Sequence, residues 1–464
     1  MADLLKYRAF NRLAASRSYP IAVQTFTLAA FGLLIAGGLA APHVEQKMAG
    51  VLRHTNLAAL IVWSLWWPLV IISAVLVGRV WCQVCPMELV NSLVSRIGLK
   101  RKVPPFMASG WAAGVFYSLA LLGFIRTFWA HRFPERMAAF FLFLFASTII
   151  VGLIFEKRAF CNFLCPVGRL LGLYACCAAL EWRVRDAKTC DACRGKDCVA
   201  ARNAYHLTAR SCTSNLYPAS IEDNRECLVC TQCRKVCASD NLRLSLRRPM
   251  ADFFGGLRLG SVEFFLLFLV SGLVVWELAE EWSPARRVLE FLPERTSAWL
   301  GVSGEPANAI QTLFLFVLLP ALLFLIPGLA GKWLNKTTLL ESARAFGLLF
   351  LPVLALGHLV KAVFRITSRL PYYPLALKDP VGYSTARLIA SGDLKVDAHI
   401  ANSLFPWMSG LAMLVFAGAM LSVWTIGLKK LAGDAPGRSA RVSHLVIVTV
   451  YGAALSLITL FGRL

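Results

Sequence analysis

The sequence predicts a polytopic α-helical membrane protein with a small cysteine-rich module inserted between its membrane spans. Three observations predict this fold class: an apolar composition, about nine apolar stretches of membrane-spanning length, and eight cysteines gathered within residues 190–237. Of the 464 residues, 58% are hydrophobic and only 16% are charged. Such a composition is typical of membrane proteins and excludes an ordinary soluble domain.

Each apolar stretch is long enough to cross the membrane as a helix, since about 30 Å of hydrocarbon requires roughly 20 helical residues. The predicted spans cover residues 19–40, 57–78, 108–128, 137–155, 261–280, 307–330, 343–364, 403–427 and 443–462. Basic residues are more frequent in the N-terminal segment and in the loop 79–105 than in the loops 41–56 and 129–136. This bias places the N-terminus in the cytoplasm, at a bacterial-type inner membrane. It also explains the net charge of +22 without a nucleic acid partner.

The spans and the cysteines divide the chain into three predicted domains. Residues 1–182 form a four-helix membrane unit, residues 183–250 form the cysteine-rich module, and residues 251–464 form a second membrane unit of about five helices. The module follows four predicted spans, so we expect it in the cytoplasm, where a reducing environment keeps thiols free. It is too small for a conventional core, and bound cofactors should therefore supply much of its folding energy.

The module ends with four cysteines in the run Cys227-Leu-Val-Cys230-Thr-Gln-Cys233-Arg-Lys-Val-Cys237. Three thiolates at these spacings bind one [4Fe–4S] cluster, while the fourth reaches a second cluster. A structural zinc site is the main alternative, but zinc sites normally use two separated cysteine pairs. A disulfide framework is typical of small secreted chains rather than of segments between membrane spans. We therefore predict iron–sulfur chemistry, and with it electron transfer.

Two further cysteine pairs follow the second and fourth predicted spans. They read Arg79-Val-Trp-Cys82-Gln-Val-Cys85-Pro86 and Arg158-Ala-Phe-Cys161-Asn-Phe-Leu-Cys165-Pro166, so the first four spans look like a duplicated unit. The spacings place each pair on one face of a helical turn, and the proline marks a helix start or break. Three interpretations remain open. The four sulfurs bind a third cluster, they form a redox-active dithiol relay, or they are buried packing residues.

This combination of motifs resembles the NapH/NosR-type membrane polyferredoxins, which are quinol-linked electron-transfer subunits. The resemblance covers about residues 55–250 and rests on paired Cys-Pro motifs followed by a ferredoxin segment. It implies a cytoplasmic two-cluster ferredoxin-like module and exchange of electrons with the quinone pool. By the crossed ligation of two-cluster ferredoxins, one cluster would take Cys190, Cys193, Cys198 and Cys237, and the other would take Cys212, Cys227, Cys230 and Cys233.

The chain departs from the family pattern in several places. The first membrane motif has two residues between its cysteines rather than three, and Cys237 is followed by Ala238 rather than by proline. The first ferredoxin run is stretched by the long intervals before Cys198 and Cys212. A short N-terminal segment precedes the first span, so we expect no flavin-bearing domain. The sequence contains no C-x-x-C-H signature, so we expect no c-type haem.

The second membrane unit carries ionisable residues within a predicted span. His358 and Lys361 lie on one stripe of the span 343–364, and ionisable residues inside a span are functional candidates. A quinone headgroup would suit this stripe. The alternative is an interhelical hydrogen bond combined with a basic side chain that extends towards the membrane surface.

Taken together, the motifs predict an integral-membrane iron–sulfur electron-transfer subunit that shuttles electrons between the quinone pool and a partner redox protein. The partner would be a redox subunit such as a multihaem cytochrome, within a quinol dehydrogenase or a related oxidoreductase complex. The alternative is a membrane-bound assembly factor that reduces a metal ion or a thiol during the maturation of another enzyme. In that case the Cys-Pro pairs would be the working site.

Overall fold

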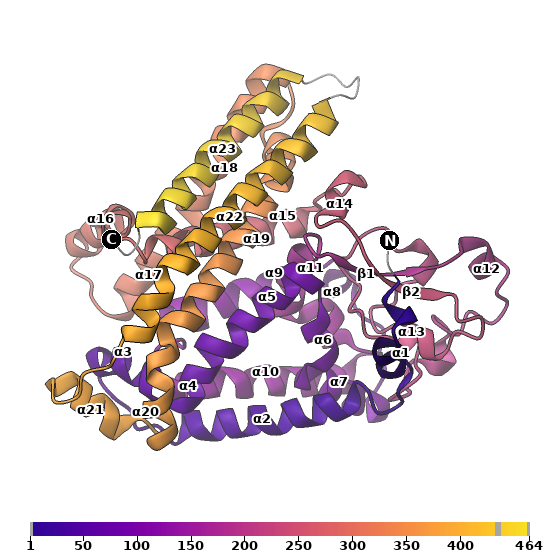
Figure 1. Ribbon diagram of the computed structural model, residues 1–464, viewed down its shortest axis with the longest axis horizontal. Helices are drawn as coiled ribbons and strands as arrows, with labels where there is room; N and C mark the ends of the chain where they lie inside the picture. The colour runs from indigo at the N-terminus through magenta and orange to yellow at the C-terminus, as the bar shows by residue number, and fades with distance from the viewer. Residues whose placement is uncertain (1–2, 432–437, 462–464) are drawn as a thin grey trace. The chain divides into compact units, whose positions relative to one another are not determined.

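The computed structural model describes residues 3–431 and 438–461, which form helices, connecting loops and one two-stranded sheet (Figure 1). By length and composition, eight of the described helical segments are suited to cross a membrane: Ile21–Leu39, Leu57–Val77, Pro134–Ile154, Ser261–Ala279, Glu305–Leu334, Leu339–Lys378, His399–Lys429 and Arg441–Phe461. The predicted span 108–128 corresponds to a shorter apolar helix, Trp111–Thr127. The prediction of a polytopic helical membrane protein is confirmed.

Internal contacts divide the chain into two compact units. Unit 1 consists of Met1–Ala36, Ile72–Phe116 and Ala138–Leu257. Unit 2 consists of Gly37–Ile71, Tyr117–Met137 and Arg258–Leu464. All fourteen cysteines of the sequence belong to unit 1.

The membrane part of unit 1 is built on apolar helices that pack through aromatic side chains. Helices α2 (Ile21–Leu39) and α10 (Pro134–Ile154) run side by side, with the ring centroids of Phe31 and Phe141 5.2 Å apart (Figure 1). The unit also contains the end of one helix, a short helix and the start of another: α5 (Trp67–Val77), α8 (Pro105–Ala108) and α9 (Trp111–Ser118). Edge-to-face aromatic contacts of this kind favour a fixed packing of the helices.

Each Cys-Pro motif ends one short helix and starts another. The helices before the prolines are α6 (Val80–Val84) and η4 (Phe160–Leu164), and those that begin with the prolines are α7 (Pro86–Ile97) and α11 (Pro166–Ala175). Cys85 and Cys165 precede these helices with extended backbones, because the residue before a proline avoids the helical region. The proline takes the first helical position, where a backbone N–H has no helical partner. Each second cysteine therefore lies at the positive end of a helix dipole.

The second motif is one residue longer than the first, and a π-helical turn accommodates the additional residue. In η4 the N–H of Cys165 donates to the carbonyl of Phe160 at 2.7 Å, five positions earlier. In the first motif the N–H of Cys82 donates to the carbonyl of Arg79 at 3.0 Å, three positions earlier. π-helical turns are rare in proteins, and those that occur are often found at functional sites. The two motifs thus reach the same helix boundary at proline through different turns.

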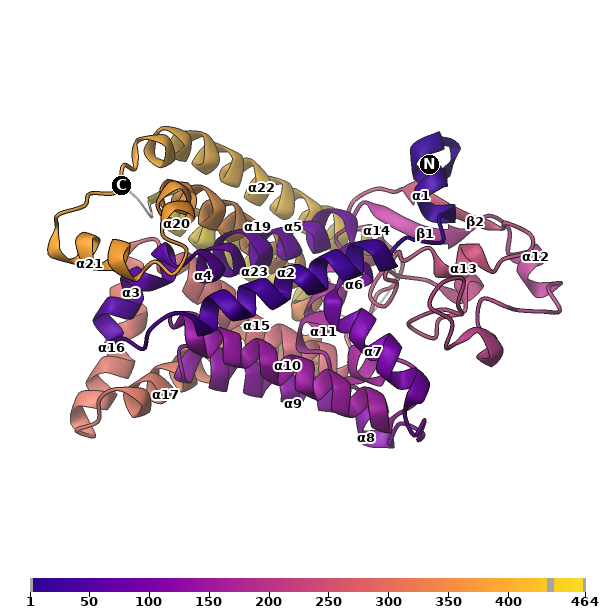
Figure 2. The same cartoon turned by 90° about the horizontal axis from the view of Figure 1, so that it is seen from below.

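The cysteine-rich module is closed by two antiparallel strands. Strand β1 (Leu180–Val184) pairs with β2 (Leu242–Leu246), with Leu180 opposite Leu246. The short helices of the module and of the segment that follows it are α12 (Ala187–Asp191), α13 (Gln232–Lys235) and α14 (Ala251–Phe254). Figure 2 shows β1, β2 and α13 close to the N-terminal helix α1 (Arg8–Ala15), which contacts α13.

The N-terminal segment completes the core of this module. Asp3 forms a β-bridge with Ser245, and its carboxylate is 3.2 Å from the guanidinium of Arg185. The buried core combines N-terminal, strand and cysteine side chains: Leu5, Ala14, Trp182, Val229, Cys233, Leu242 and Leu244. A segment of this size buries little apolar surface alone, so the docked N-terminus adds to its stability.

Gly172 lets the loop before Cys227 approach α11 closely. A Cβ atom at this position would lie 2.6 Å from the backbone oxygen of Arg225. The Nη1 of Arg79 donates to the same oxygen at 3.0 Å. Because only glycine leaves room for this contact, the loop and the helix are held together at this point.

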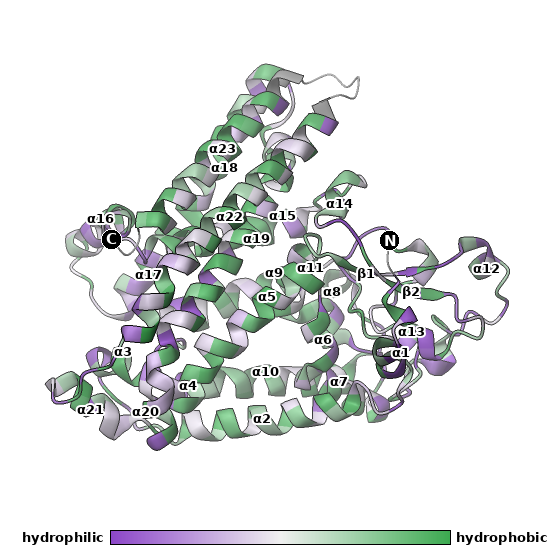
Figure 3. Cartoon of the chain, in the orientation of Figure 1, coloured by the Kyte–Doolittle hydropathy of each residue, from purple (hydrophilic) through white to green (hydrophobic). Residues whose placement is uncertain are grey.

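Unit 2 is a bundle of long apolar helices. Its elements are α3 (Gln46–Thr55), α4 (Leu57–Ile61), η2 (Val62–Trp66), η3 (Leu119–Thr127), α15 (Ser261–Ala279), α16 (Ser283–Trp299), α17 (Glu305–Leu313), η7 (Phe314–Leu318), α18 (Leu319–Asn335), α19 (Leu339–Arg369), α20 (Tyr373–Lys378), α21 (Tyr383–Ser391), α22 (His399–Leu431) and α23 (Arg438–Phe461). At the C-terminal end, α19 contacts α18, α22 and α23, and α23 also contacts α18 and α22. Figure 3 shows hydrophobic residues along α22 and α23, as expected for helices that face lipid or other helices.

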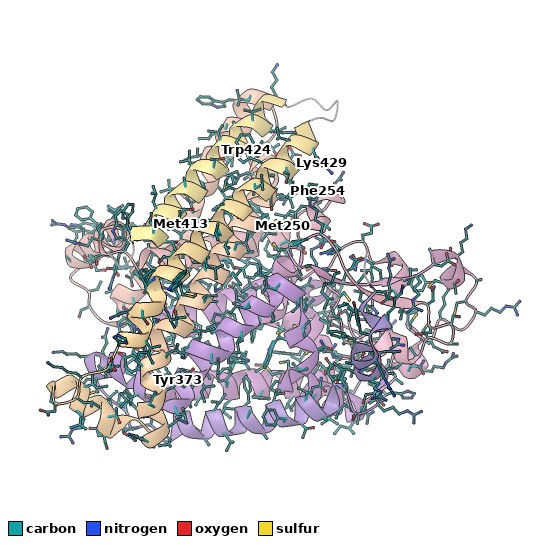
Figure 4. The ribbon with its side chains drawn as sticks, in the orientation of Figure 1. Met250, Phe254, Tyr373, Met413, Trp424 and Lys429 are labelled. Atoms are coloured by element: carbon teal, nitrogen blue, oxygen red, sulfur yellow. The ribbon has the colours of Figure 1, made fainter. Side chains whose placement is uncertain are left out.

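Side-chain hydrogen bonds join several helices of unit 2. Trp424 on α22, labelled in Figure 4, donates from Nε1 to the hydroxyl of Thr449 on α23 at 3.1 Å. Tyr373, at the start of α20, has its hydroxyl 3.0 Å from that of Ser64 in η2. Such bonds satisfy polar groups that have no water to bind in a membrane.

Candidate functional site

The first group of four cysteines lies around α12 and the end of the predicted module. Burial, followed by the charge of Cys237, raises the pKa of Cys198 to about 11, and Cys190 and Cys193 act on the same thiol. Four thiols that interact in this way lie near one another. We call Cys190, Cys193, Cys198 and Cys237 quartet A.

The second group is formed by Cys212 and the first three cysteines of the 227–237 run. Burial, followed by the charges of Cys230 and Cys227, raises the pKa of Cys212 to about 12. The thiol of Cys233 is buried and interacts with the same three cysteines. We call Cys212, Cys227, Cys230 and Cys233 quartet B. The crossed ligation predicted for a two-cluster ferredoxin assigns one cluster to each of these quartets, and this assignment stays a prediction.

The backbone of the run between Cys227 and Cys233 is strained. Val229 and Thr231 have φ values of 56° and 61°, in the left-handed region that β-branched residues rarely adopt. Such strain persists only where the surrounding structure requires it, and it is concentrated at functional sites. The two strained residues lie between Cys227 and Cys233, beside Cys230.

The third group brings the two Cys-Pro motifs together. Burial, followed by the charges of Cys161, Cys165 and Cys82, holds the pKa of Cys85 well above its usual range. Burial also raises the pKa of Cys161 to about 12, although Arg158 opposes the shift. We call Cys82, Cys85, Cys161 and Cys165 quartet C. The internal repeat therefore contributes one cysteine pair from each half.

No group of three or more His, Cys, Asp or Glu side chains within residues 3–431 and 438–461 is arranged to hold a single metal ion. A cube of four irons takes one thiolate at each iron, so its ligands are spread around a larger body than one ion. The donor set of each quartet, four sulfurs, is the set that such a cube requires. Binding would also need the thiols to lose their protons, which burial alone disfavours.

Short hydrogen bonds connect the three quartets in sequence. The N–H of Cys212 in quartet B donates to the carbonyl of Cys198 in quartet A at 2.7 Å. The hydroxyl of Thr213 is 3.4 Å from the sulfur of Cys230 in quartet B. The side-chain amide of Asn162, which lies between the cysteines of the second Cys-Pro motif, donates to the carbonyl of Thr213 at 3.0 Å. The quartets are thus linked in the order A, B, C.

Several sulfurs accept hydrogen bonds from neighbouring groups. The indole Nε1 of Trp182 donates to the sulfur of Cys233 at 3.1 Å, and the amide of Asn241 donates to that of Cys190 at 3.2 Å. The backbone N–H of Gly168 donates to the sulfur of Cys165 at 3.4 Å. Hydrogen bonds to ligand sulfurs orient the ligands and influence the reduction potentials of iron–sulfur clusters.

A buried group of charges lies beside quartet C. Glu88 on α7 pairs with Arg158 at 2.7 Å and with Arg210 at 2.5 Å, and all three residues are at most 5% exposed. Burial raises the pKa of Glu88, but Arg158 and Arg210 lower it more, so its pKa is below the usual range. Arg79 is also buried, so these four residues together carry three guanidinium charges and one carboxylate charge, a net charge of two.

Polar residues of α2 support the first Cys-Pro motif, and the sequence analysis missed them. The amide of Gln24 donates to the carbonyl of Gln83 at 2.8 Å and also contacts Glu88. The hydroxyl of Thr27 donates to the carbonyl of Val84 at 2.8 Å. The available signal was the presence of glutamine and threonine in an otherwise apolar predicted span. Glu88 and Arg210 lie far apart in the sequence, and no pattern joined them.

The ionisable stripe of α19 lies in unit 2 and contacts α15. Lys361 Nζ is 2.7 Å from a carboxylate oxygen of Glu281, and Arg365 donates to Glu277 at 2.9 Å. The Nε2 of His358 is 3.8 Å from the second carboxylate oxygen of Glu277. The ring of Trp67 lies 6.3 Å from that of His358. Basic and acidic side chains on the two helices therefore balance each other inside the bundle.

Comparison with protein families gives a match in the part of the chain that carries the Cys-Pro motifs. A family model described as a 4Fe-4S binding domain matches residues 59–105 and 138–180. The first match contains Cys82 and Cys85, and the second contains Cys161 and Cys165. Iron–sulfur binding is therefore supported by a comparison that is independent of the cysteine-rich module.

Comparison with curated proteins gives distant relatives. An uncharacterized protein of Methanocaldococcus jannaschii is 25% identical over 182 residues, which cover 38% of this chain and 68% of the relative. The ferredoxin-type protein NapH of Haemophilus influenzae is 23% identical over 231 residues, which cover 46% of this chain and 74% of the relative. No solved structure matches the chain. The resemblance to NapH-type membrane polyferredoxins is confirmed, and a membrane-associated role in electron transfer is supported.

Proposed function

We propose that this chain, which is similar to NapH-type membrane polyferredoxins, is the three-cluster electron-transfer subunit of a quinol-linked membrane complex. Quartets A, B and C would each hold one [4Fe–4S] cluster, so the chain would bind three clusters. When bound, each cluster accepts and donates one electron at a time. The protein fixes the distances, orientations and potentials of the clusters.

The observation that carries this proposal is the hydrogen-bonded sequence of the three quartets. Cys198 and Cys212 join quartets A and B directly through one backbone hydrogen bond. Asn162 and Thr213 join quartets B and C through two side chains. A continuous series of closely spaced carriers is what electron transfer from a membrane face to a soluble module requires.

The buried charges favour a cluster in quartet C over a dithiol relay. Two disulfides or four protonated thiols would be neutral and would leave two buried guanidinium charges without an anion. Each uncompensated buried charge costs several kcal/mol. A cube held by four thiolates carries a net charge of about −2, which balances them.

We propose that quinone binds near His358. Lys361 pairs with Glu281 just after α15, Arg365 pairs with Glu277 on α15, and the Nε2 of His358 lies 3.8 Å from Glu277. A histidine beside a carboxylate is suited to accept a proton from a quinol hydroxyl, because its ring nitrogen is a hydrogen-bond acceptor and a general base. The aromatic ring of Trp67 offers a flat apolar surface for the quinone ring. An unchanged affinity for a quinone-site inhibitor in His358→Ala would contradict this placement.

We place the quartets on the cytoplasmic side of an inner membrane, as the basic N-terminal segment and the basic loop 79–105 suggest. A partner redox subunit, such as a cytochrome, would then complete the transfer of electrons. In this arrangement all three clusters lie on one side of the membrane. Electrons would therefore cross the membrane either by diffusion of quinone or through the partner subunit.

The proposal is tested by anaerobic purification of the full chain with iron, sulfide and zinc analysis and EPR. Three clusters predict about twelve iron atoms per chain. The reduced protein should give EPR signals. These signals should disappear when a quinone analogue oxidises the clusters and should return when quinol reduces them. About eight iron atoms would contradict the cluster in quartet C, and stoichiometric zinc without iron would contradict all three clusters.

Replacing Trp182 with phenylalanine should lower the potential of the cluster in quartet B without loss of iron. The change removes an N–H···S bond to Cys233 and keeps an aromatic ring in a site that is 1% exposed. Since about 59 mV corresponds to a tenfold change for a one-electron couple, we expect a decrease of about 30–60 mV. Redox titration followed by EPR measures it. Trp424→Phe, which removes an indole hydrogen bond in unit 2, should leave the potential unchanged.

A further inference from the structure

The two Cys-Pro motifs share an arginine three residues before their first cysteine. Arg79 stands in this position in the first motif, and Arg158 stands in it in the second. Both are buried, with 8% and 5% of their surfaces exposed. A guanidinium group keeps its charge even when it is buried, so it needs an anion nearby.

Arg79 lies between quartets B and C. Its Nη1 donates to the carbonyl of Arg225, two residues before Cys227. A Cβ atom on Gly168 would lie 3.1 Å from Nη2 of Arg79 and 3.6 Å from Cβ of Cys165, so the guanidinium packs next to this cysteine. Its charge lowers the pKa of both Cys165 and Cys227, against the larger effect of burial.

Arg158 has the corresponding place in the other half of the repeat. Its charge interacts with the sulfurs of Cys161 and Cys82 in quartet C and of Cys230 in quartet B. The two arginines therefore reach different sulfurs of the same two quartets. The duplication of the motif has placed one fixed positive charge before the first cysteine of each pair of quartet C.

The protein groups around these arginines do not satisfy them fully. Among residues 3–431 and 438–461, the Nε of Arg79 and the Nη1 of Arg158 have no hydrogen-bond partner. The nearest buried carboxylate, Glu88, is shared between Arg158 and Arg210. Two buried N–H donors on the arginines that precede the cysteines of quartet C are thus left for a further acceptor.

We propose that Arg79 and Arg158 are paired positioning residues that compensate the charge of the cluster in quartet C and raise its reduction potential. This inference rests on the proposed function, because it requires a cluster in that quartet. Reduction adds one electron, which comes from a neighbouring cluster or from quinol, and so makes the cluster more negative. A fixed positive charge stabilises the reduced form more than the oxidised form, and its removal lowers the potential.

The test is a redox titration, followed by EPR, of the full chain with Arg79→Gln and with Arg158→Gln. We expect each change to lower the reduction equilibrium constant of this cluster at least tenfold, which is about 59 mV for one electron. The lysine variants, Arg79→Lys and Arg158→Lys, keep the charge and should recover most of the shift. Glu88→Gln removes the opposing negative charge and should shift the potential upwards.

Arg202→Gln is the matched control. Arg202 lies four residues after Cys198, at a similar sequence distance from a ligand candidate, but its side chain is 66% exposed and pairs with Asp197. Its removal should leave the potential unchanged. If Arg79 and Arg158 have a purely structural role, their variants should lose stability. The reduction potential should then not fall in the glutamine variants, recover in the lysine variants and rise in Glu88→Gln.

The outcomes separate this inference from the proposed function. Wild-type protein with about eight iron atoms would overturn the cluster in quartet C itself. With about twelve iron atoms present, unchanged potentials in the arginine variants would overturn only the role of the arginines. If a glutamine variant loses the cluster in quartet C altogether, the iron content of the lysine variant decides. About four more iron atoms in the lysine variant than in the glutamine variant would support the charge role, and loss of the cluster in both variants would overturn it.

Discussion

Replacing Cys161 with alanine is expected to remove one iron–sulfur cluster and to leave two. The iron content should fall from about twelve to about eight atoms per chain, because a cube with three protein ligands in a buried site is lost or degraded. The EPR signals of quartets A and B should persist, since their eight cysteines are unchanged. Electron transfer from quinol to the module should decrease at least a hundredfold, since quartet C lies at one end of the path. Iron analysis and stopped-flow spectroscopy measure the two effects.

Cys176→Ala is the control for this experiment. Cys176 is 0% exposed and lies on the same stretch of chain, but its sulfur contacts the carbonyl of Gly172 rather than other cysteines of a quartet. The control should keep about twelve iron atoms. An unchanged iron content in Cys161→Ala would show that quartet C does not hold a cluster, and an unchanged rate would remove it from the electron path.

Replacing Asp252 with alanine should destabilise the module by about 3 kcal/mol. Asp252 pairs with the buried Arg247, and its carboxylate accepts the N–H of Asn224 at 3.0 Å, close to Cys227. Breaking a buried ion pair typically costs about 3–5 kcal/mol, because one charge is left without its partner. The lower value is expected here, since Glu181 remains 3.9 Å from Arg247. Thermal unfolding of the detergent-solubilised protein, monitored through cluster absorbance, measures the change.

Glu226→Ala is the corresponding exposed control. The carboxylate of Glu226 is 51% exposed and lies 3.5 Å from Arg169. Ion pairs on the surface contribute about 0–1 kcal/mol, so this variant should unfold close to the wild-type temperature. Equal destabilisation by both variants would contradict the importance of the buried pair.

The sequence predicted the features that depend on local composition and spacing. Membrane spans follow from long apolar runs, because the hydrocarbon thickness sets the length of a helix. The division of the module cysteines between two quartets is a prediction from ligand spacing and stays one, with the long interval before Cys212 included. The start of α7 and α11 follows from proline, which favours the first turn of a helix.

Other features depend on contacts between distant segments and could not be read from the sequence. The docking of Leu5 and Ala14 into the module joins the N-terminus to strands that begin about 180 residues later. The triad of Glu88, Arg158 and Arg210 likewise requires three segments to fold together. The π-helical turn before Cys165 depends on one additional residue, which no propensity distinguishes from an ordinary helical turn.

The packing of the N-terminus against the module also determines whether the chain between them crosses the membrane an even or an odd number of times. Because Asp3 pairs with Ser245 and α1 packs on α13, the N-terminus and the cysteine-rich module lie on one side of the membrane. The chain between them must therefore cross an even number of times. Three of the eight long apolar helices precede β1, so a fourth crossing is required, and the short helix Trp111–Thr127 is the segment available to make it. The contact between the N-terminus and the module thus bears on how this short helix is threaded through the bilayer.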